Sequence, residues 1–534
     1  MALTLLNPSS VMSLPPSPHN LESFQDLVFR TLKDQQDLTA VERFTLIHEN
    51  QPSSLSKRYS TLLPVTIPAK GEQYAFEVDL DRCSSCKACV TACHNLNGLT
   101  DNESWRRVGT LVGGSPLKPE LRTVTTACHH CVDPGCLNGC PVGAYEKDTA
   151  TGIVRHLDDQ CIGCQYCSMT CPYDVPVYLP SLGIVRKCDM CYQRITGAEA
   201  PACVQACPNE AIAIRVVTKA QVTERAAEGT FLSDTPDPRH TKPTTVYKTQ
   251  LDTAGFRAAD HFKPILQPAH WPLILMLLLT QGSAGLWIAM GIVTFTATGP
   301  TFIATLLASL TFTAGLMASF FHLGRPMKAW RFFLGLKTSW LSREILAFNA
   351  CLPLLMGCLI SWKFMPALVP TLHFIMSGTM LIAVVCSIFV YSATGRNSWR
   401  FSRTAGKFFG SVALACLSCL LLTGDPFMRA VGWVGFIVVL LARGLQELAF
   451  STIDKPGTSD EDAHAVFSEN TYYPMLARAR RAGYLFLPVL LIYAGSLHKL
   501  YLSAGLIALV ALVELTDRFL FFRTVAPNRM PGVR

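Results

Sequence analysis

The chain has 534 residues, of which 50% are hydrophobic and 16% charged, and its formal net charge is +8. This length exceeds that of one ordinary hydrophobic core, so we expect at least two domains. The basic residues form no dense patch, which argues against nucleic acid as a partner. The low charged fraction indicates that about half of the chain lies in a lipid bilayer.

Residues 1–73 read as an N-terminal extension. It has no basic leader and no long apolar core, so we expect no cleaved export signal. We expect disorder through Pro18 and two short amphipathic helices near residues 21–33 and 39–48. Thr39 fits a helix N-cap, with Glu42 three residues on. The extension either packs against a partner or the following domain, or is a simple leader.

Sixteen of the 21 cysteines fall into four consecutive groups. The groups are Cys83, Cys86, Cys89, Cys93; Cys128, Cys131, Cys136, Cys140; Cys161, Cys164, Cys167, Cys171; and Cys188, Cys191, Cys203, Cys207. A C-x2-C-x2-C loop wraps three corners of a cubane iron–sulfur cluster, while the fourth cysteine points away and ligates a second cluster. Proline follows the fourth cysteine in three of the groups, and His94 takes that place in the first.

This pattern predicts four [4Fe–4S] clusters, each with three ligands from one group and one from a partner group. Zinc prefers paired C-x2-C units and does not need three cysteines in one loop. Disulfides would need an oxidising compartment, and nothing in the sequence marks export of this region. Because all sixteen positions are cysteine, we expect no [3Fe–4S] variant. His129 and His130 are expected to be surface residues or neighbours of the cluster ligands rather than ligands.

Residues 74–217 are expected to fold as a small α+β domain of tandem ferredoxin-like units. Residues 74–79 alternate like a strand, residues 144–157 read as a hairpin that turns at 149–152, and residues 211–217 read as a closing strand. Residues 218–268 are polar, without a long apolar run, and are expected to form a linker.

Apolar segments in residues 269–523 predict an all-α bundle of eight transmembrane helices. The expected spans are residues 271–295, 301–321, 345–362, 364–392, 408–424, 430–442, 482–497 and 500–513, and the last continues through Phe522. The sixth is short for a span. Residues 524–534 are expected to form a C-terminal tail.

Charges between the spans predict the orientation of this bundle. With eight spans, the N-terminal domain, the even-numbered connections and the C-terminus share one side, and the connections and C-terminus alone carry eighteen lysines and arginines. The opposite side carries only Lys363, Arg429 and Lys499. The positive-inside rule therefore predicts a multi-pass protein of the inner (cytoplasmic) membrane whose cysteine-rich domain faces the cytoplasm.

Four ionisable residues lie near the cytoplasmic ends of the expected spans: His322, Glu344, Glu447 and Glu514. Polar groups at membrane depth are costly and often functional, so His322, Glu344 and Glu514 are candidates for a proton-accepting site. The alternatives stay open, because Glu514 and Arg518 have the spacing of an ordinary i,i+4 ion pair and Glu447 fits a solvated loop. The five cysteines after residue 350 are read as small apolar packing residues.

The cysteine groups resemble the iron–sulfur electron-transfer subunit of the dimethyl sulfoxide reductase family over residues 74–217. The apolar half resembles the eight-helix anchor subunit of the same family over residues 268–523. The matching features of the anchor are His270-Trp271-Pro272 with Gln281, His322-Leu323-Gly324-Arg325-Pro326, Ser342-Arg343-Glu344, and Glu514 with Arg518. In that family the two subunits are separate chains, whereas here they are one. The resemblance implies a quinol site tied to His322 and a third partner, a molybdopterin-containing catalytic subunit.

These features predict a chain that takes electrons from menaquinol or ubiquinol near His322 and passes them through four clusters to the catalytic subunit. The reverse path, in which a partner dehydrogenase reduces the quinone, is the alternative, because cysteine positions do not fix the direction. A membrane transporter or redox sensor with an attached cluster domain is a remote alternative. Such a protein needs charged or broken helices near the membrane midplane. The central parts of these spans are nearly free of charge, which argues against that alternative.

Overall fold

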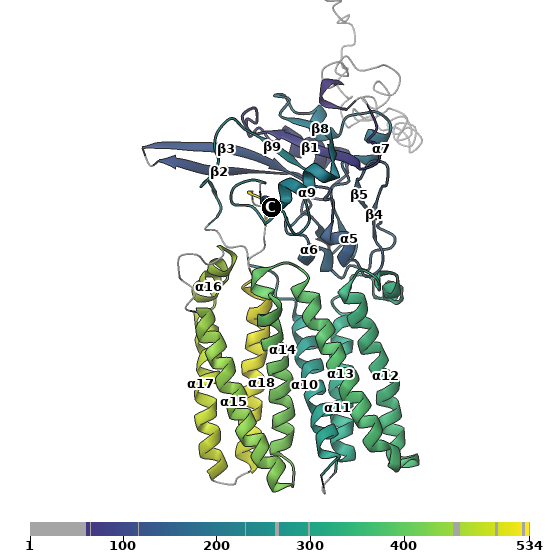
Figure 1. Ribbon diagram of the computed structural model, residues 1–534, viewed down its shortest axis with the longest axis vertical. Coiled ribbons are helices and arrows are strands. Elements are labelled where there is room, and N and C mark those ends of the chain that lie inside the picture. Colours follow the sequence, from purple (N-terminus) through teal and green to yellow (C-terminus); the bar gives the residue numbers. More distant parts are fainter. Residues whose placement is uncertain are drawn as a thin grey trace, which may run out of the picture. The chain divides into compact units, whose positions relative to one another are not determined.

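The computed structural model describes residues 60–532 apart from 65, 116, 230, 262–265, 297–298, 452–459, 497–499 and 526–528. The helices expected near residues 21–33 and 39–48 therefore lie outside the described residues. Residues from Leu62 onward form one compact unit. This unit joins a part built of small sheets to a part built of long helices (Figure 1).

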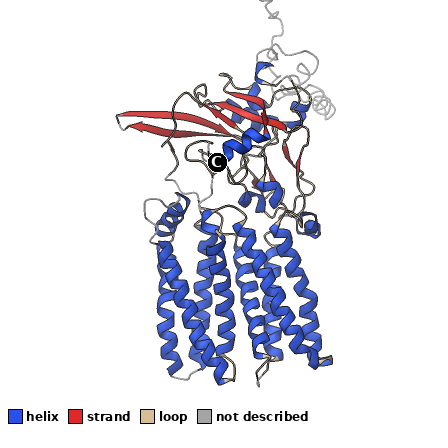
Figure 2. Ribbon diagram, viewed as in Figure 1, coloured by secondary structure: helices blue, strands red, loops and turns tan. Residues whose placement is uncertain are grey.

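Small sheets and short helices make up the first part, residues 72–261, which we call the cluster domain (Figure 2). β1 (Glu72–Asp79) pairs antiparallel with β8 (Ile212–Thr218), from Glu72 opposite Thr218 to Val78 opposite Ile212. This confirms the strands expected at 74–79 and 211–217. The expected hairpin is also confirmed, as β4 (Tyr145–Lys147) paired with β5 (Val154–His156).

Two further hairpins and five short helices complete the core of the cluster domain. β2 (Arg107–Ser115) pairs with β3 (Lys118–Thr126), and β6 (Val177–Leu179) pairs with β7 (Ile184–Arg186). The helices are α4 (Ala88–Leu96), α5 (Gly135–Gly139), α6 (Tyr166–Thr170), α7 (Tyr192–Thr196) and α8 (Ala202–Gln205). Four of the five, α4 to α7, begin within four residues after a cysteine of one of the groups, so each cysteine loop leads into a helical turn.

Residues 218–268 add elements to the cluster domain instead of forming the expected linker. α9 (Lys219–Ala227) is capped by Thr218, β9 (Val246–Lys248) pairs parallel with β1, and β10 (Arg257–Ala258) pairs antiparallel with β2. α9 buries Val222 and Ala226, and β9 and β10 pair through backbone hydrogen bonds with the edges of existing sheets. Such pairing needs no apolar run, which is why the polar sequence hid it.

The second part, which we call the anchor, contains eight helices of 19 or more residues in the described part of the chain (Figure 1). They are α10 (Trp271–Val293), α11 (Phe302–Phe320), α12 (Trp340–Phe364), α13 (Val369–Ser392), α14 (Phe401–Leu421), α15 (Pro426–Ser451), α17 (Pro474–Ser496) and α18 (Leu500–Arg523). Six of these, α10 to α15, are long and apolar enough to cross a bilayer. A shorter helix, α16 (Asp460–Tyr472), precedes α17.

Burial in the anchor is inverted relative to a protein in water. On α11, Ile303 and Leu307 are exposed while Thr305 and Ser309 are buried. Exposed apolar side chains suit contact with lipid, whereas small and polar side chains let membrane helices approach closely. At Gly285 of α10, for example, a Cβ would lie 2.4 Å from the carbonyl oxygen of Val412 in α14. The anchor is therefore packed as a membrane bundle.

Four helices, α12, α14, α15 and α17, extend beyond the spans expected from hydropathy, and two of these extensions include candidate residues. α15 covers 26 residues instead of 430–442, so Glu447 lies within a helix and not in a solvated loop. α12 begins at Trp340, which puts Glu344 inside the first turns of the helix. Hydropathy ended the sixth span too early because Arg443 and Glu447 lower it, and both side chains are buried in ion pairs.

Candidate functional site

Two cavities of the cluster domain are each lined by four cysteines from two different groups. Three cysteines of the first group meet the last cysteine of the fourth: Cys83, Cys86, Cys89 and Cys207. Three cysteines of the second group meet the last cysteine of the third: Cys128, Cys131, Cys136 and Cys171. We call these the first and the second set. Each combines a tight loop with one distant thiol, as the sequence pattern predicts.

The other eight cysteines gather in the same manner. Cys161, Cys164 and Cys167 lie near Cys140, and we call these four the third set. Cys188, Cys191 and Cys203 lie near Cys93, and these form the fourth set. The first and fourth groups therefore exchange their last cysteines, and so do the second and third.

The backbone around the cysteine loops is shaped to turn thiols inward and to donate hydrogen bonds to them. Lys87 and Gln165 each follow the second cysteine of their loop and adopt left-handed conformations, with φ of 60° and 59°. Backbone N–H groups also point at sulfur atoms. Gly163 donates to Cys161 Sγ at 3.4 Å, and Ala144 donates to Cys140 Sγ at 3.2 Å. Such donors stabilise anionic sulfur and tune the potentials of iron–sulfur clusters.

The donor sets fit a group that brings positive charge. Burial raises the pKa of Cys93 to about 12, and the neighbouring thiol of Cys203 adds to the shift. Burial likewise raises the pKa of Cys171 to about 11. Four buried thiolates in one pocket would repel each other, so they need cations to hold them deprotonated. Iron supplies that charge, and the sixteen cysteines fit [4Fe–4S] clusters by their geometry and their chemistry.

His322 lies where the anchor meets the cysteines of the third set. It follows α11, and its imidazole ring stands edge-on to that of His270, with 5.1 Å between the ring centroids. The His322 side chain also reaches the backbone of Cys164. Burial lowers the pKa of His322 to about 4, so the ring is neutral at physiological pH. Within the described residues its Nε2 atom has no hydrogen-bond partner.

The loop after His322 binds the backbone of the cluster domain. Arg325 N–H donates to the carbonyl of Ile162 at 3.0 Å, and Gly335 N–H donates to that of Pro141 at 2.9 Å. The Ser339 hydroxyl donates to the carbonyl of Gly139 at 2.7 Å. These acceptors flank Cys140 and Cys161, so the anchor holds both segments that supply the third set.

Glu344 lies close to the same loop. Its carboxylate accepts a short hydrogen bond from Ser387 of α13, and the side chain is buried. Tyr166, two residues after Cys164, has a pKa raised first by burial and then by the nearby Glu344 carboxylate. The Tyr166 hydroxyl donates to the carbonyl of Val390 at 2.6 Å. His322 and Glu344 therefore both converge on the segment from Cys164 to Cys167.

Glu514 belongs to a different cluster of side chains. Its carboxylate accepts hydrogen bonds from Tyr484 at 2.6 Å and from Ser411, and it lies 3.5 Å from Arg443. The predicted pair with Arg518 is long, at 3.9 Å. None of these partners is shared with His322 or Glu344 among the described contacts. The structure thus brings two of the three candidate proton acceptors to one loop and leaves the third apart.

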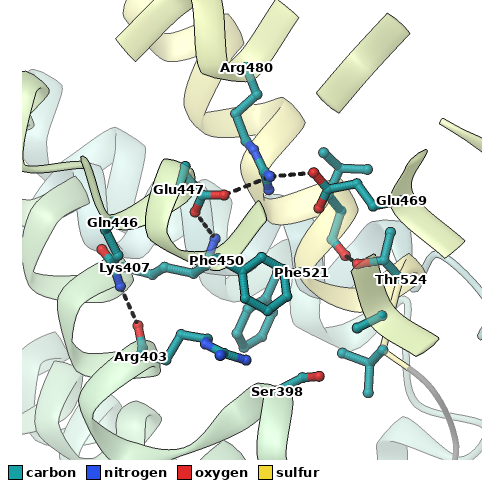
Figure 3. Close-up of a pocket in the computed structure, with 13 residues that line it drawn as sticks. Ser398, Arg403, Lys407, Gln446, Glu447, Phe450, Glu469, Arg480, Phe521 and Thr524 are labelled. Atoms are coloured by element: carbon teal, nitrogen blue, oxygen red, sulfur yellow. Dashed lines mark hydrogen bonds and ion pairs between the residues drawn. The ribbon is translucent and has the colours of Figure 1, made fainter. Parts of the chain in front are cut away.

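Glu514 and Glu447 both join a buried ionic network of α14, α15, α16, α17 and α18. At its centre Asp517 lies 2.5 Å from Lys407, 2.8 Å from Arg443 and 3.2 Å from Arg480. Figure 3 shows its outer part, where Glu447 pairs with Lys407 and Arg480, and Arg480 also pairs with Glu469. The network has eight charged members: Lys407, Arg443, Arg480, Arg518, Glu447, Glu469, Glu514 and Asp517. Four cations and four anions balance, which permits their burial.

The histidines of the second cysteine group are buried neighbours of the ligands and not surface residues. His129 is 2% exposed, packs against the ring of Tyr173 and bonds Thr245 at 2.8 Å. His130 is fully buried and accepts from the backbone of Val154 at 3.1 Å. Of the anchor cysteines, Cys351, Cys358 and Cys416 are buried.

Two buried cations near the cysteines were not identified from the sequence. Arg106 and Lys187 are both 2% exposed. Arg106 directly precedes β2, a strand that was not expected from the sequence. Lys187 directly precedes Cys188, where a lysine could equally well be exposed to solvent. A lysine in that position carries no signal of its own, so only the packing could have identified it.

Comparison with known proteins assigns each part of the chain. Residues 120–217 match the family model "4Fe-4S dicluster domain", and residues 267–522 match "DMSO reductase anchor subunit (DmsC)". The B subunit of the anaerobic dimethyl sulfoxide reductase of Haemophilus influenzae is 36% identical over 203 residues, which are 35% of this chain and 96% of that protein. The corresponding B subunit of Escherichia coli is 35% identical over 202 residues, with the same coverage.

A further relative belongs to a different enzyme. The formate dehydrogenase-O iron–sulfur subunit of Escherichia coli is 34% identical over 176 residues, which are 29% of this chain and 58% of that protein. The chain is therefore an iron–sulfur electron-transfer protein with a multi-pass membrane anchor. It belongs to the dimethyl sulfoxide reductase family and joins the iron–sulfur subunit and the anchor subunit of that family in one polypeptide.

Proposed function

We propose that the chain carries electrons from a membrane quinol to a molybdopterin-containing reductase subunit through four [4Fe–4S] clusters. The observation that carries this proposal is the contact of His322 with the backbone of Cys164. It joins the candidate quinol site of the anchor directly to a candidate cluster loop. Quinol oxidation at this point would deliver electrons to the third set first.

The four cysteine sets are the proposed cluster ligands. Each bound cluster would accept and release one electron at a time, and the protein fixes where these carriers lie. The third set adjoins the second, because the Tyr145 hydroxyl lies beside Cys167 and Cys140 of the third and Cys136 of the second. The second adjoins the fourth at Lys187, and the fourth adjoins the first at Arg106. The proposed path therefore runs from the third set through the second and fourth to the first.

The first set is the proposed exit to the catalytic partner. Cys86 is exposed, and Cys83 and Cys207 are half-buried, whereas the second set has three buried cysteines and one half-buried cysteine, Cys171. An exposed ligand permits a partner's redox centre to approach closely. The relatives named as subunits of dimethyl sulfoxide reductase favour a molybdopterin reductase as that partner.

His322 is the proposed proton acceptor, because its neutral imidazole has a nitrogen without a partner in the described residues. Glu344 is the proposed second acceptor, and both lie at the cluster-domain end of their helices. Menaquinol and ubiquinol both suit such a site. Glu514, bound within the ionic network, is the weakest of the three candidates and is proposed to act in stability.

We further propose that α17 and α18 also span the membrane, which gives eight spans in the inner (cytoplasmic) membrane with the cluster domain in the cytoplasm. Their charged side chains would otherwise forbid this, but Arg480, Glu514 and Asp517 are paired inside the bundle. Protons from the quinol would then be released on the cytoplasmic side, and this step would not itself build a proton gradient.

His322→Ala in the complex purified with its catalytic partner tests the site. We expect slower reduction of the clusters by a quinol and weaker inhibition by quinone analogues, with unchanged reduction by dithionite. His373→Ala is the matched control, because His373 is also fully buried in the anchor but bonds Thr305 of α11. Wild-type quinol oxidation and inhibition in His322→Ala would refute the site. Titration of the four cluster potentials against the quinone couple tests the direction, and uniformly lower cluster potentials would favour the reverse path.

A further inference from the structure

Arg106 and Lys187 are buried cations that chiefly face cysteine sulfur, and Asp189 attracts Lys187 less than three cysteines do. In the described part of the chain neither forms an ion pair with an aspartate or glutamate. Nitrogen Nη1 of Arg106 donates to the Thr125 hydroxyl at 3.2 Å, and its Nη2 atom has no hydrogen-bond partner among the described residues. A fully buried charge without a counter-charge is strongly destabilising. The counter-charge must therefore come from something else in the domain.

Lys187 lies between the second and the fourth set. Its ammonium is 3.6 Å from Cys128 Sγ of the second set and donates to the carbonyl of Cys188, of the fourth set, at 2.9 Å. It also donates to the carbonyl of Val154 and lines the cavity of the second set. The strongest attractions on its charge come from Cys128, Cys136 and Cys188.

Arg106 occupies the equivalent place between the fourth and the first set. The thiols that attract its guanidinium are Cys203, Cys188 and Cys93 of the fourth set and Cys89 of the first. The Thr125 hydroxyl that accepts its hydrogen bond lies 3.6 Å from Cys89 Sγ. Its other face stacks on the ring of Phe76, 4.7 Å from the centroid, which keeps water away.

The gap between the second and third sets, unlike the gaps between the other neighbouring sets, holds no cation in the described residues. Tyr145 lies there, and it is buried and uncharged. Two of the three gaps along the proposed path thus hold a buried cation, and the gap nearest the quinol site holds a neutral hydroxyl.

We propose that Arg106 and Lys187 are positioning residues that raise the reduction potentials of the clusters on either side of them and neutralise those clusters in the folded protein. This rests on the proposed cluster ligation. Reduction adds one electron and no proton to a cluster with thiolate ligands, so a nearby fixed cation stabilises the reduced form more than the oxidised form. Each electron leaves one cluster and enters the next, while the lysine and arginine keep their protons throughout.

The arrangement has a consequence for the path. A cation that lies between two clusters raises the reduction potential of both, so the difference in potential between them stays small. The fourth set lies between both cations and gains from each. The third set gains least, which leaves its cluster the least stabilised as an electron acceptor by these two residues.

The test is a redox titration of each cluster, followed by electron paramagnetic resonance, in Lys187→Met of the complete complex. We expect the potentials of the second and fourth clusters to fall. At a fixed potential the ratio of reduced to oxidised cluster should drop about tenfold, which is about 59 mV for a one-electron couple. The first and third clusters should keep their potentials. Unchanged potentials with full iron content, or an equal shift of all four, would refute the proposal.

Matched variants separate charge from packing. Arg106→Met should lower the first and fourth potentials, while Arg106→Lys keeps the charge in a smaller side chain and should retain wild-type values. Lys147→Met is the comparison for a partly solvated charge, because Lys147 is half-buried and lies near Cys131 and Cys136 of the second set, so a smaller shift confined to the second cluster is expected. If both methionine variants lose iron, Arg106→Lys decides, and loss of iron there too would refute the role of charge.

Iron and sulfide analysis of the wild type keeps this inference distinct from the proposed function. Fewer than four clusters in the wild type would overturn the proposed ligation. Four clusters whose potentials ignore both cations would overturn only the present inference.

Discussion

Gly324→Ala should separate the anchor from the cluster domain at the point where electrons are proposed to cross. The added Cβ would lie 2.2 Å from the carbonyl oxygen of Gly183, 2.6 Å from its carbonyl carbon and 2.7 Å from its Cα. Gly163 and Gly183 are themselves in left-handed conformations against this loop, so backbone meets backbone on both sides. Ordinary contact needs about 3.4 Å, so the loops must move apart by roughly 1 Å, an overpacking that costs about 1–3 kcal/mol.

That movement would loosen the neighbouring hydrogen bond from Arg325 N–H to the carbonyl of Ile162, which is 3.0 Å long. A displacement of about 1 Å in a reactive geometry costs up to about 100-fold in rate, so we expect quinol-driven reduction of the clusters to slow by about tenfold. The assay follows cluster reduction by a quinol in membranes, with dithionite reduction as the measure of cluster content. Gly282→Ala is the matched control, because its Cβ would meet nothing within 4 Å. A wild-type quinol rate in Gly324→Ala, with unchanged cluster content, would refute the role of this contact.

Three other changes test the remaining structure. Asp517→Asn leaves four buried cations facing three anions and should lower the free energy of unfolding by about 3–5 kcal/mol. The measurement is the unfolding temperature of the detergent-purified protein, which the exposed control Lys363→Met should leave unchanged. Tyr166→Phe should cost about 1 kcal/mol in the same assay, because it leaves the Val390 carbonyl without its 2.6 Å donor, and an unchanged temperature would contradict that contact. Iron chelation should expose residues 74–217 to limited proteolysis while the anchor stays resistant, and equal resistance of both parts would contradict folding by cluster ligation.

The sequence predicted features whose cause is local. The cysteine spacing identified all sixteen residues of the four sets, because each loop is a short turn with its own geometry. The β1–β8 pair and the β4–β5 hairpin also followed from alternation and turn residues. The exchange of last cysteines was predicted in kind, but the pairing of particular groups depends on how distant segments pack, and spacing alone left it open.

Features that depend on distant partners were missed or misread. The polar segment 218–268 looked like a linker because pairing of β9 and β10 to sheet edges leaves no hydrophobic pattern. Glu447 was assigned to a loop because the sequence alone shows a charge but not the Lys407 and Arg480 that neutralise it. Arg106 and Lys187 gave no signal, since the counter-charges they face come from cysteines of several groups.

The charge count that predicts the orientation contains side chains of two kinds. Four of the eighteen basic residues assigned to the cytoplasmic side, Lys407, Arg443, Arg480 and Arg518, lie within helices and are buried in the ionic network. These four side chains pair with carboxylates inside the bundle, so they should not be counted as loop charges that orient the protein. The remaining fourteen still exceed the three on the opposite side, so the prediction of a cytoplasmic cluster domain does not depend on the buried members.

The two parts of the chain bury cations by opposite means, and this difference separates their folding. In the anchor every cation of the network has a carboxylate partner, on a neighbouring helix for Lys407, Arg443 and Arg480 and on α18 itself for Arg518, so the network is neutral by itself. In the cluster domain Arg106 and Lys187 face thiols instead of carboxylates, and burial raises the pKa of Cys188 and Cys93 among these thiols, so those two stay uncharged until iron binds. We therefore expect the anchor to fold in the membrane before any cofactor arrives, whereas the cluster domain would reach charge balance only when its proposed clusters bind. The anchor loop from Gly324 to Ser339 forms hydrogen bonds with the segments that supply the third set. We therefore expect the folded anchor to help these segments reach the geometry that the third set needs.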